Sequence, residues 1–188
     1  MTVKTDVSRF HIHDELTAPE GSIGILKAVL SRGSITNLLG VLANAPVALR
    51  AYARLRAELR GSTLSRQTRE RIAIATAERR GDAYSVHEHA RTARAAGVGI
   101  DEIAKARSFA SADEREQTLL TFCEAVLESN GAVPHYLLEE AREADWNDEQ
   151  ILEAVAQLGL SLYESLLANA AGLPKEDTVK RSVLPAAA

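Results

Sequence analysis

Two residues that can exchange protons, Glu70 and His89, occupy positions that a pair of neighbouring helices would bring together. Residues 68–97 contain two helix-forming segments separated by Gly81, which predicts antiparallel helices joined by a tight turn. Glu70 lies about ten residues before the turn and His89 about eight after it, so at 1.5 Å per residue their side chains fall at similar depth. A carboxylate beside an imidazole orients the ring and stabilises its protonated form, which predicts a catalytic acid–base pair.

Three further polar residues of the same segment, Asp82, Tyr84 and Ser85, are candidates for binding a substrate. Ser85 and His89 are four residues apart and share a helix face, and Asp82 precedes Ser85 by three. Each of these residues also has an ordinary structural interpretation. Asp82 suits a helix N-cap, Ser85 a first helical turn and Tyr84 a packing position. Glu70 can equally be a solvated charge, and His89 a partly buried histidine.

A metal site is a weaker interpretation of this segment. Glu70, Asp82 and His89 offer mixed nitrogen and oxygen donors, but their spacing is not a recognised ligand pattern. His87 and His89 are two residues apart on the predicted helix and point about 200° from each other, so they cannot both face one ion. We therefore expect neither a metal nor another cofactor.

The sequence around this segment predicts further helices and no strands. Capping residues and helix breakers divide the chain into segments at about 34–43, 46–60, 65–80, 82–96, 101–107, 111–129, 134–143 and 147–171. Ser34, Ser65, Asp82, Ser111 and Asn147 are the expected N-caps. Residues 1–21 are polar and without periodicity and are predicted to form an N-terminal arm, followed by a single domain over 22–188. The expected fold is therefore an all-α bundle of about eight helices.

Composition supports this fold and excludes several classes of protein. The 188 residues contain 46% hydrophobic but only 4% aromatic residues, which favours closely packed, alanine- and leucine-rich helices. A net charge of −4 gives no general attraction for nucleic acid or an anionic membrane. No signal-peptide pattern and no uninterrupted apolar run of membrane-spanning length occur in the sequence, so we expect a soluble cytoplasmic protein. Cys123 is the only cysteine, which excludes an intramolecular disulfide and a Cys-x-x-Cys redox pair.

Positive charge is nevertheless concentrated in one part of the chain. Residues 50–80 contain nine arginines and three glutamates, whereas residues 139–153 are acidic. A basic helix face is usually solvated, but this one can also attract an anionic substrate or an acidic neighbouring subunit. No nucleic-acid-binding motif accompanies it.

The Glu70-to-His89 segment resembles the alkylhydroperoxidase D-like (AhpD-like) and carboxymuconolactone decarboxylase superfamily, in particular its peroxidase-related branch. The resemblance covers about residues 35–177. In the thiol-using branch a Glu is followed by Cys-x-Tyr-Cys and then by a His four residues after the second Cys. Glu70, Tyr84 and His89 match this motif, while Asp82 and Ser85 replace the two cysteines.

The two replaced cysteines determine what the resemblance implies. A hydroperoxidase of this type needs a thiolate nucleophile and a resolving thiol, so we expect no Cys-x-x-Cys-dependent peroxidase activity. Lactone decarboxylases of the superfamily work without the cysteine pair. The resemblance then implies proton transfer, in a decarboxylation or isomerisation, on a small carboxylated or carbonyl-bearing substrate. It also implies a homo-oligomer with a pocket near a subunit interface.

Two other hypotheses remain open from the sequence. In one, the protein is a non-catalytic binding or assembly protein in which the redox site has become a helix cap and a packed polar cluster. In the other, Cys123 supports a residual antioxidant role. Neither hypothesis requires Glu70 and His89 to transfer a proton to or from a substrate.

Overall fold

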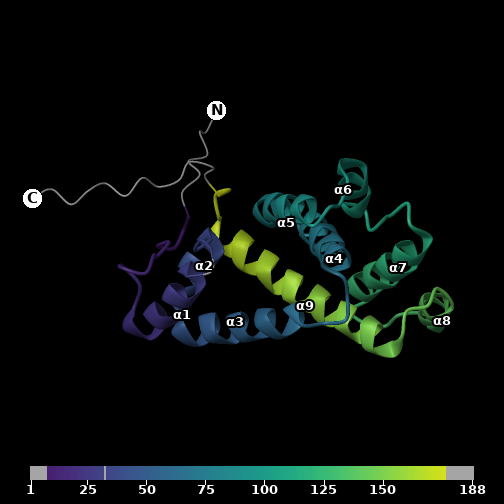
Figure 1. The fold of residues 1–188 in the computed structure, drawn as a ribbon, viewed down its shortest axis with the longest axis horizontal. Helices are drawn as coiled ribbons and strands as arrows, with labels where there is room; N and C mark the ends of the chain where they lie inside the picture. Colours follow the sequence, from purple (N-terminus) through teal and green to yellow (C-terminus); the bar gives the residue numbers. More distant parts are fainter. Residues whose placement is uncertain (1–7, 32, 177–188) are drawn as a thin grey trace, which may run out of the picture.

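The computed structural model describes residues 8–31 and 33–176, which form nine α-helices and no strand (Figure 1). The helices are α1 (Glu20–Leu30), α2 (Asn37–Leu42), α3 (Pro46–Arg60), α4 (Arg66–Arg79), α5 (Ala83–Ala95), α6 (Ile100–Ala106), α7 (Glu114–Glu128), α8 (His135–Glu143) and α9 (Asp148–Ala171). The predicted all-α fold is confirmed for the described residues, and the eight predicted helices are all present. The ninth, α1, was not predicted.

Helix α9 crosses the middle of the protein, with α3 along one side and the α4–α5 pair along the other (Figure 1). The middle of helix α4 is buried on every side, because α5, α9 and α6 all pack against this helix. Four consecutive residues there, Ile72, Ala73, Ile74 and Ala75, are buried. Small alanine side chains let these helices approach closely. The hairpin predicted around Gly81 is therefore clamped by α9.

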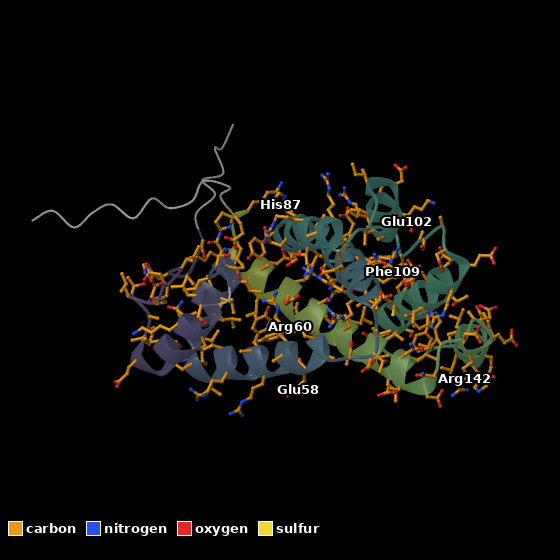
Figure 2. All side chains as sticks on the ribbon, viewed as in Figure 1. Glu58, Arg60, His87, Glu102, Phe109 and Arg142 are labelled. Carbon is orange, nitrogen blue, oxygen red and sulfur yellow. The ribbon has the colours of Figure 1, made fainter. Side chains whose placement is uncertain are left out.

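The apolar core is divided along α9 into two main clusters. The first lies among α4, α7, α8 and the start of α9, and the second among α1, α2, α3 and the end of α9. Phe109, in the loop before α7, is fully buried in the first cluster and lies between α4 and α7 (Figure 2). The two clusters hold both ends of α9 and so fix the part between them.

Most helix ends follow the local signals in the sequence. Pro46 occupies the first turn of α3, Ser65 accepts a hydrogen bond from the amide of Thr68, and Asn147 opens α9 with a full capping box. Two predicted caps are wrong by two residues. Thr36 rather than Ser34 caps α2, and Asp113 rather than Ser111 caps α7. Ser111 instead donates its hydroxyl to Glu102.

The described part of the predicted arm, residues 8–18, lies along the body of the protein. The Arg9 amide donates to the last carbonyl of α9, and the His13 amide donates to Gly40 in α2. A Cβ atom at Gly40 would come within 2.7 Å of the His13 carbonyl oxygen, so this crossing requires glycine. Residues 1–7 of the arm lie outside the described residues.

Helix α9 is long and apolar enough to cross a membrane, but it serves here as a core helix. Half of its most apolar window is buried inside the protein. The recurrence of Ile151, Val155, Leu158, Leu162 and Leu166 at helical spacing predicts one apolar stripe. Ile151 and Leu158 are buried, but Leu166 is 55% exposed. The buried face instead carries polar side chains, including Ser161, Glu164 and Ser165. Of these residues, Glu164 belongs to the site described next.

Candidate functional site

His89 lies at the centre of a hydrogen-bonded cluster that joins three helices. Its Nδ1 lies 2.8 Å from Glu70 Oε2 on α4, and its Nε2 lies 3.2 Å from Glu164 Oε2 on α9. The expected contact between Glu70 and His89 is therefore present. The second ring nitrogen, which a catalytic histidine would use to exchange a proton with substrate, is not free, because it is bonded to Glu164.

A fourth helix completes the cluster. The hydroxyl of Tyr52 on α3 donates a 2.7 Å hydrogen bond to Glu164 Oε1. Tyr52 is 2% exposed and Glu164 is 4% exposed, so both groups are held deep between α3 and α9. The sequence analysis missed both residues. One signal was available for Glu164, which is the only charged residue between Glu153 and Lys175.

The positions of these side chains follow from the local sequence. Gly81 adopts a left-handed conformation (φ 65°) that turns the chain directly from α4 into α5. The amide side chain of Asn169 on α9 donates to the carbonyl of Arg80 at this turn, which fixes the register of α9 against the hairpin. Glu164 lies five residues, or about one and a half turns, before Asn169 and so reaches His89. Figure 2 shows side chains filling the space between α3, α5 and α9.

The two carboxylates hold His89 in its protonated form. Burial lowers the pKa of the imidazole, but the hydrogen bonds and charges of Glu164 and Glu70 outweigh it and raise the pKa to about 10. For Glu164, burial raises the pKa of the carboxyl, yet the bonds from His89 and Tyr52 leave that pKa below its ordinary value. At neutral pH the cluster is therefore a buried imidazolium between two carboxylates.

The side chains of the cluster differ in their exposure to solvent. The side chain of His89 is 19% exposed and that of Glu70 is 15% exposed, against 5% for Glu164. Glu70 uses Oε2 for His89, and within the described residues its Oε1 makes no hydrogen bond. A small molecule approaching the cluster thus meets Glu70 and His89 before the buried pair of Glu164 and Tyr52.

Two hollows in the described part of the chain lie away from the cluster. One, of about 330 Å³, lies between α7, α8 and α9 and is lined by apolar side chains such as Phe122, Val133 and Leu138. Another lies between α7 and α8 around Arg115. Neither hollow is lined by a residue of the His89 cluster. The pocket expected near a subunit interface stays a prediction.

Asp82 caps α5 and lies apart from the bonded cluster. Its Oδ1 accepts the amide of Ser85 at 3.0 Å, and the residue is 1% exposed. This is the N-cap role that the sequence left open. Its other oxygen, Oδ2, is buried without a hydrogen-bond partner in the described structure. Ser85 is 3% exposed, so neither residue presents its side chain to solvent.

Tyr84 points away from His89, towards the segment that follows α9. Its hydroxyl donates to Glu176 Oε1 at 2.7 Å and accepts the Leu38 amide at 3.3 Å. Glu176 also accepts the Asn37 amide at 2.6 Å, so this carboxylate caps α2. Tyr84 therefore joins α5, α2 and the segment after α9, which is a structural arrangement. Of the five predicted site residues, Glu70 and His89 are in direct contact within the cluster, whereas Asp82 and Ser85 contact each other only as a helix cap.

The described residues contain no group of three or more His, Cys, Asp or Glu side chains arranged to hold a metal ion. Cys123 lies on α7 in the first apolar cluster and is fully buried. Burial raises the pKa of its thiol to about 12, which suppresses the reactive thiolate. The cysteine therefore belongs to the core.

Residues 46–128 match the carboxymuconolactone decarboxylase family. This range contains Tyr52, Glu70 and His89 but ends before Glu164. No functionally curated relative matches the sequence. The part that matches is thus the α3–α7 portion of the fold, and the α9 residue of the cluster lies outside it.

Several solved structures share the fold at low sequence identity. An uncharacterised peroxidase-related protein with an AhpD core from Ralstonia eutropha JMP134 superimposes with a TM-score of 0.80 at 20% identity, over 91% of this chain and 93% of that one. A peroxidase-related protein from Silicibacter sp. TM1040 gives 0.79 at 18% identity, over 94% and 95%. A protein of unknown function from Agrobacterium tumefaciens, a candidate antioxidant defence protein AhpD, gives 0.66 at 21% identity, over 72% and 95%.

Proposed function

Since residues 46–128 match the carboxymuconolactone decarboxylase family and the described part of the chain has the AhpD-like fold, we propose that the protein is a cofactor-free acid–base enzyme of this family. It would act on a small carboxylated or carbonyl-bearing molecule by decarboxylation or isomerisation. The observation that carries this proposal is the part-open Glu70–His89–Glu164 cluster, in which one carboxylate oxygen of Glu70 remains available.

The geometry supports different roles for Glu70 and His89 from those that their spacing suggested. Both ring nitrogens of His89 carry protons that are bonded to carboxylates, so His89 is poorly placed to accept a further proton. Glu70 is the accessible carboxylate, and its free Oε1 can take a proton from carbon next to a carbonyl group. The electron pair of that C–H bond moves onto the carbonyl oxygen, giving an enolate, and the same carboxyl can return the proton to another carbon.

In this proposal Glu164 and Tyr52 are positioning residues. They hold the imidazolium of His89 against Glu70, so that the positive charge beside the reacting carboxylate is fixed before substrate arrives. A preorganised charge of this kind stabilises the developing enolate without reorganisation of the site. The replacement of the motif cysteines by Asp82 and Ser85 leaves this chemistry intact, since in the described structure neither side chain is hydrogen-bonded to the cluster.

A residual antioxidant role through Cys123 has little physical support. The thiol is fully buried among apolar side chains, and its pKa of about 12 keeps it protonated. The description of one structural relative as an antioxidant protein applies to that relative. For this chain we propose a soluble, cytoplasmic homo-oligomer without peroxidase activity.

The test is exchange of substrate carbon-bound hydrogen for solvent deuterium, followed by proton NMR on a panel of 2-oxo acids, β-keto acids and carboxylated lactones. The Glu70→Gln variant keeps the shape of the side chain and removes the base. We expect its exchange or turnover rate to fall by about 100-fold or more. Glu58→Gln, an exposed change on α3 (Figure 2), is the matched control.

The folding of each variant is checked by circular dichroism and thermal unfolding before its rate is compared. A folded Glu70→Gln protein with an unchanged rate would refute the proposal. Absence of exchange and turnover with every member of the panel would favour the binding-protein hypothesis instead.

A further inference from the structure

Arg56 on α3 is the positive group beside the cluster whose role the proposed chemistry leaves open. It lies one helical turn after Tyr52, and its guanidinium carbon is 5.8 Å from the centroid of the Tyr52 ring. The residue is half-buried, unlike Arg50, Arg54 and Arg60 of the same helix, which are exposed. Arg56 is therefore the arginine of α3 that faces inward, above the buried end of the cluster.

The charge of Arg56 interacts with the cluster. Its pKa is raised by Tyr52 most strongly and, against the effect of burial, by Glu164 and Glu70. The Tyr52 ring beside the guanidinium donates its hydroxyl to Glu164, so the guanidinium lies at the Tyr52–Glu164 end of the cluster. Within the described residues, however, Arg56 forms no ion pair with Glu70 or Glu164 and makes no hydrogen bond. None of its side-chain nitrogens is fully buried, so solvent can reach them.

This arrangement differs from that of other arginines in the described structure. Arg71, for example, lies within 4 Å of two carboxylates, and Arg107 forms a two-pronged ion pair with Glu78. Arg56 keeps its hydrogen-bond donors unused at a half-buried position. A guanidinium presents a fixed fork that matches a carboxylate with two parallel hydrogen bonds.

The charges of the site determine which charge a ligand of the Arg56 guanidinium should carry. Glu70 and Glu164 are negative, and His89 and Arg56 are positive, so the four groups together are neutral. An incoming anion is then attracted by the one cation that has no bonded carboxylate. Without Arg56 the remaining three groups carry one net negative charge and would repel the same anion.

We propose that Arg56 anchors the carboxylate of an anionic substrate, so that the site selects small carboxylates over neutral carbonyl compounds. This inference rests on the proposed function, because it assigns the substrate class of the same site. Arg56 is a binding residue in this scheme, while Glu70 accepts the proton. The anchored carboxylate directs the adjacent carbon towards the free oxygen of Glu70.

The test measures binding without turnover. Acetate, malonate and glutarate are titrated into the protein, in parallel with acetamide, malonamide and glutaramide, by calorimetry and by NMR of the arginine side-chain Nε–H signals. We expect saturable binding of at least one carboxylate and none of its amide. Arg56→Gln should weaken that binding by about tenfold or more, whereas the exposed control Arg54→Gln should leave it unchanged.

Equal binding by the Arg56→Gln protein, or no carboxylate binding by the unmodified protein, overturns the inference. Arg56→Lys retains the charge without the fork, and a binding loss in this variant supports two-pronged recognition. The two proposals fail separately. If hydrogen exchange depends on Glu70 but not on Arg56, only the role of Arg56 as the anchor is refuted. If carboxylate binding depends on Arg56 but the exchange rate is unchanged in Glu70→Gln, only the proposed enzyme mechanism is refuted.

Discussion

Raising the pH above neutrality is expected to destabilise the fold through the imidazolium of His89. The pKa of this group is raised from 6.5 to about 10 in the folded protein. A group with a raised pKa contributes stability that is fully present below its unfolded value of 6.5 and is lost as the pH rises through about 10. The contribution should therefore decline steadily from pH 7 upward.

The size of the effect follows from the same two pKa values. Proton linkage gives a loss of about 2–3 kcal/mol in the free energy of unfolding between pH 7 and pH 9. The lowered pKa of Glu164 does not interfere, because its contribution is lost only at acid pH. The thiol of Cys123, whose pKa is raised by burial, also destabilises the fold when the unfolded chain ionises near pH 9.

Urea unfolding followed by circular dichroism at pH 7, 8 and 9 measures this slope. The His89→Gln variant lacks the titrating group and should show a much flatter dependence. Because both proteins contain Cys123, subtracting one profile from the other cancels the thiol contribution. The exposed histidine on α8 gives the matched control, since His135→Gln should retain the full slope.

Removing His89 also leaves two buried carboxylates without their cation, which can cost about 3–5 kcal/mol and prevent folding. NMR titration of the His89 ring in the unmodified protein then gives the same information directly. A ring that titrates near 6.5, or a pH slope shared equally by His89→Gln, would refute the assignment of a bridged imidazolium.

Three further outcomes are expected. Tyr52→Phe leaves a buried oxygen of Glu164 without its donor and should lower the free energy of unfolding by about 1–3 kcal/mol, whereas Tyr136→Phe, at an exposed position, should change it little. Asp82→Ala removes the N-cap of α5 and should cost about 1 kcal/mol in chemical denaturation, while Asp82→Asn keeps an acceptor and should cost less. Cys123 should react with a disulfide reagent only as fast as the protein unfolds, and rapid labelling of the folded protein would contradict its burial.

Local sequence signals predicted most of the fold because caps and breakers act over a few residues. Asp82 and Asn147 open their helices as expected, since each places an acceptor three residues before an amide that needs one. The wrong caps arose where two candidates stood close together. Asp113 lies two residues after Ser111, and the structure uses the residue nearer to the first helical turn. Helix α1 was missed because no side chain caps its start and because it contains Gly21 and Gly24, which disfavour a helix.

The Glu70–His89 contact was predictable because both residues lie on one hairpin whose turn is short. Glu164 was not found because it comes from α9, where the sequence was interpreted as an apolar stripe through Leu166. The buried face of α9 is partly polar, since it meets a charged histidine rather than a purely apolar surface. Periodicity alone cannot separate a polar residue that faces water from one that faces a buried cation.

The cluster also has a consequence for the order in which the chain folds. The contact between Glu70 and His89 spans 19 residues, but those from Glu164 to His89 and to Tyr52 span 75 and 112. Short contacts form with little loss of chain entropy, whereas long ones wait until distant segments have docked. A folding intermediate with the α4–α5 hairpin but without α9 would hold only half of the cluster. Completion of the site therefore coincides with completion of the tertiary structure, so that partly folded chains would lack the proposed activity.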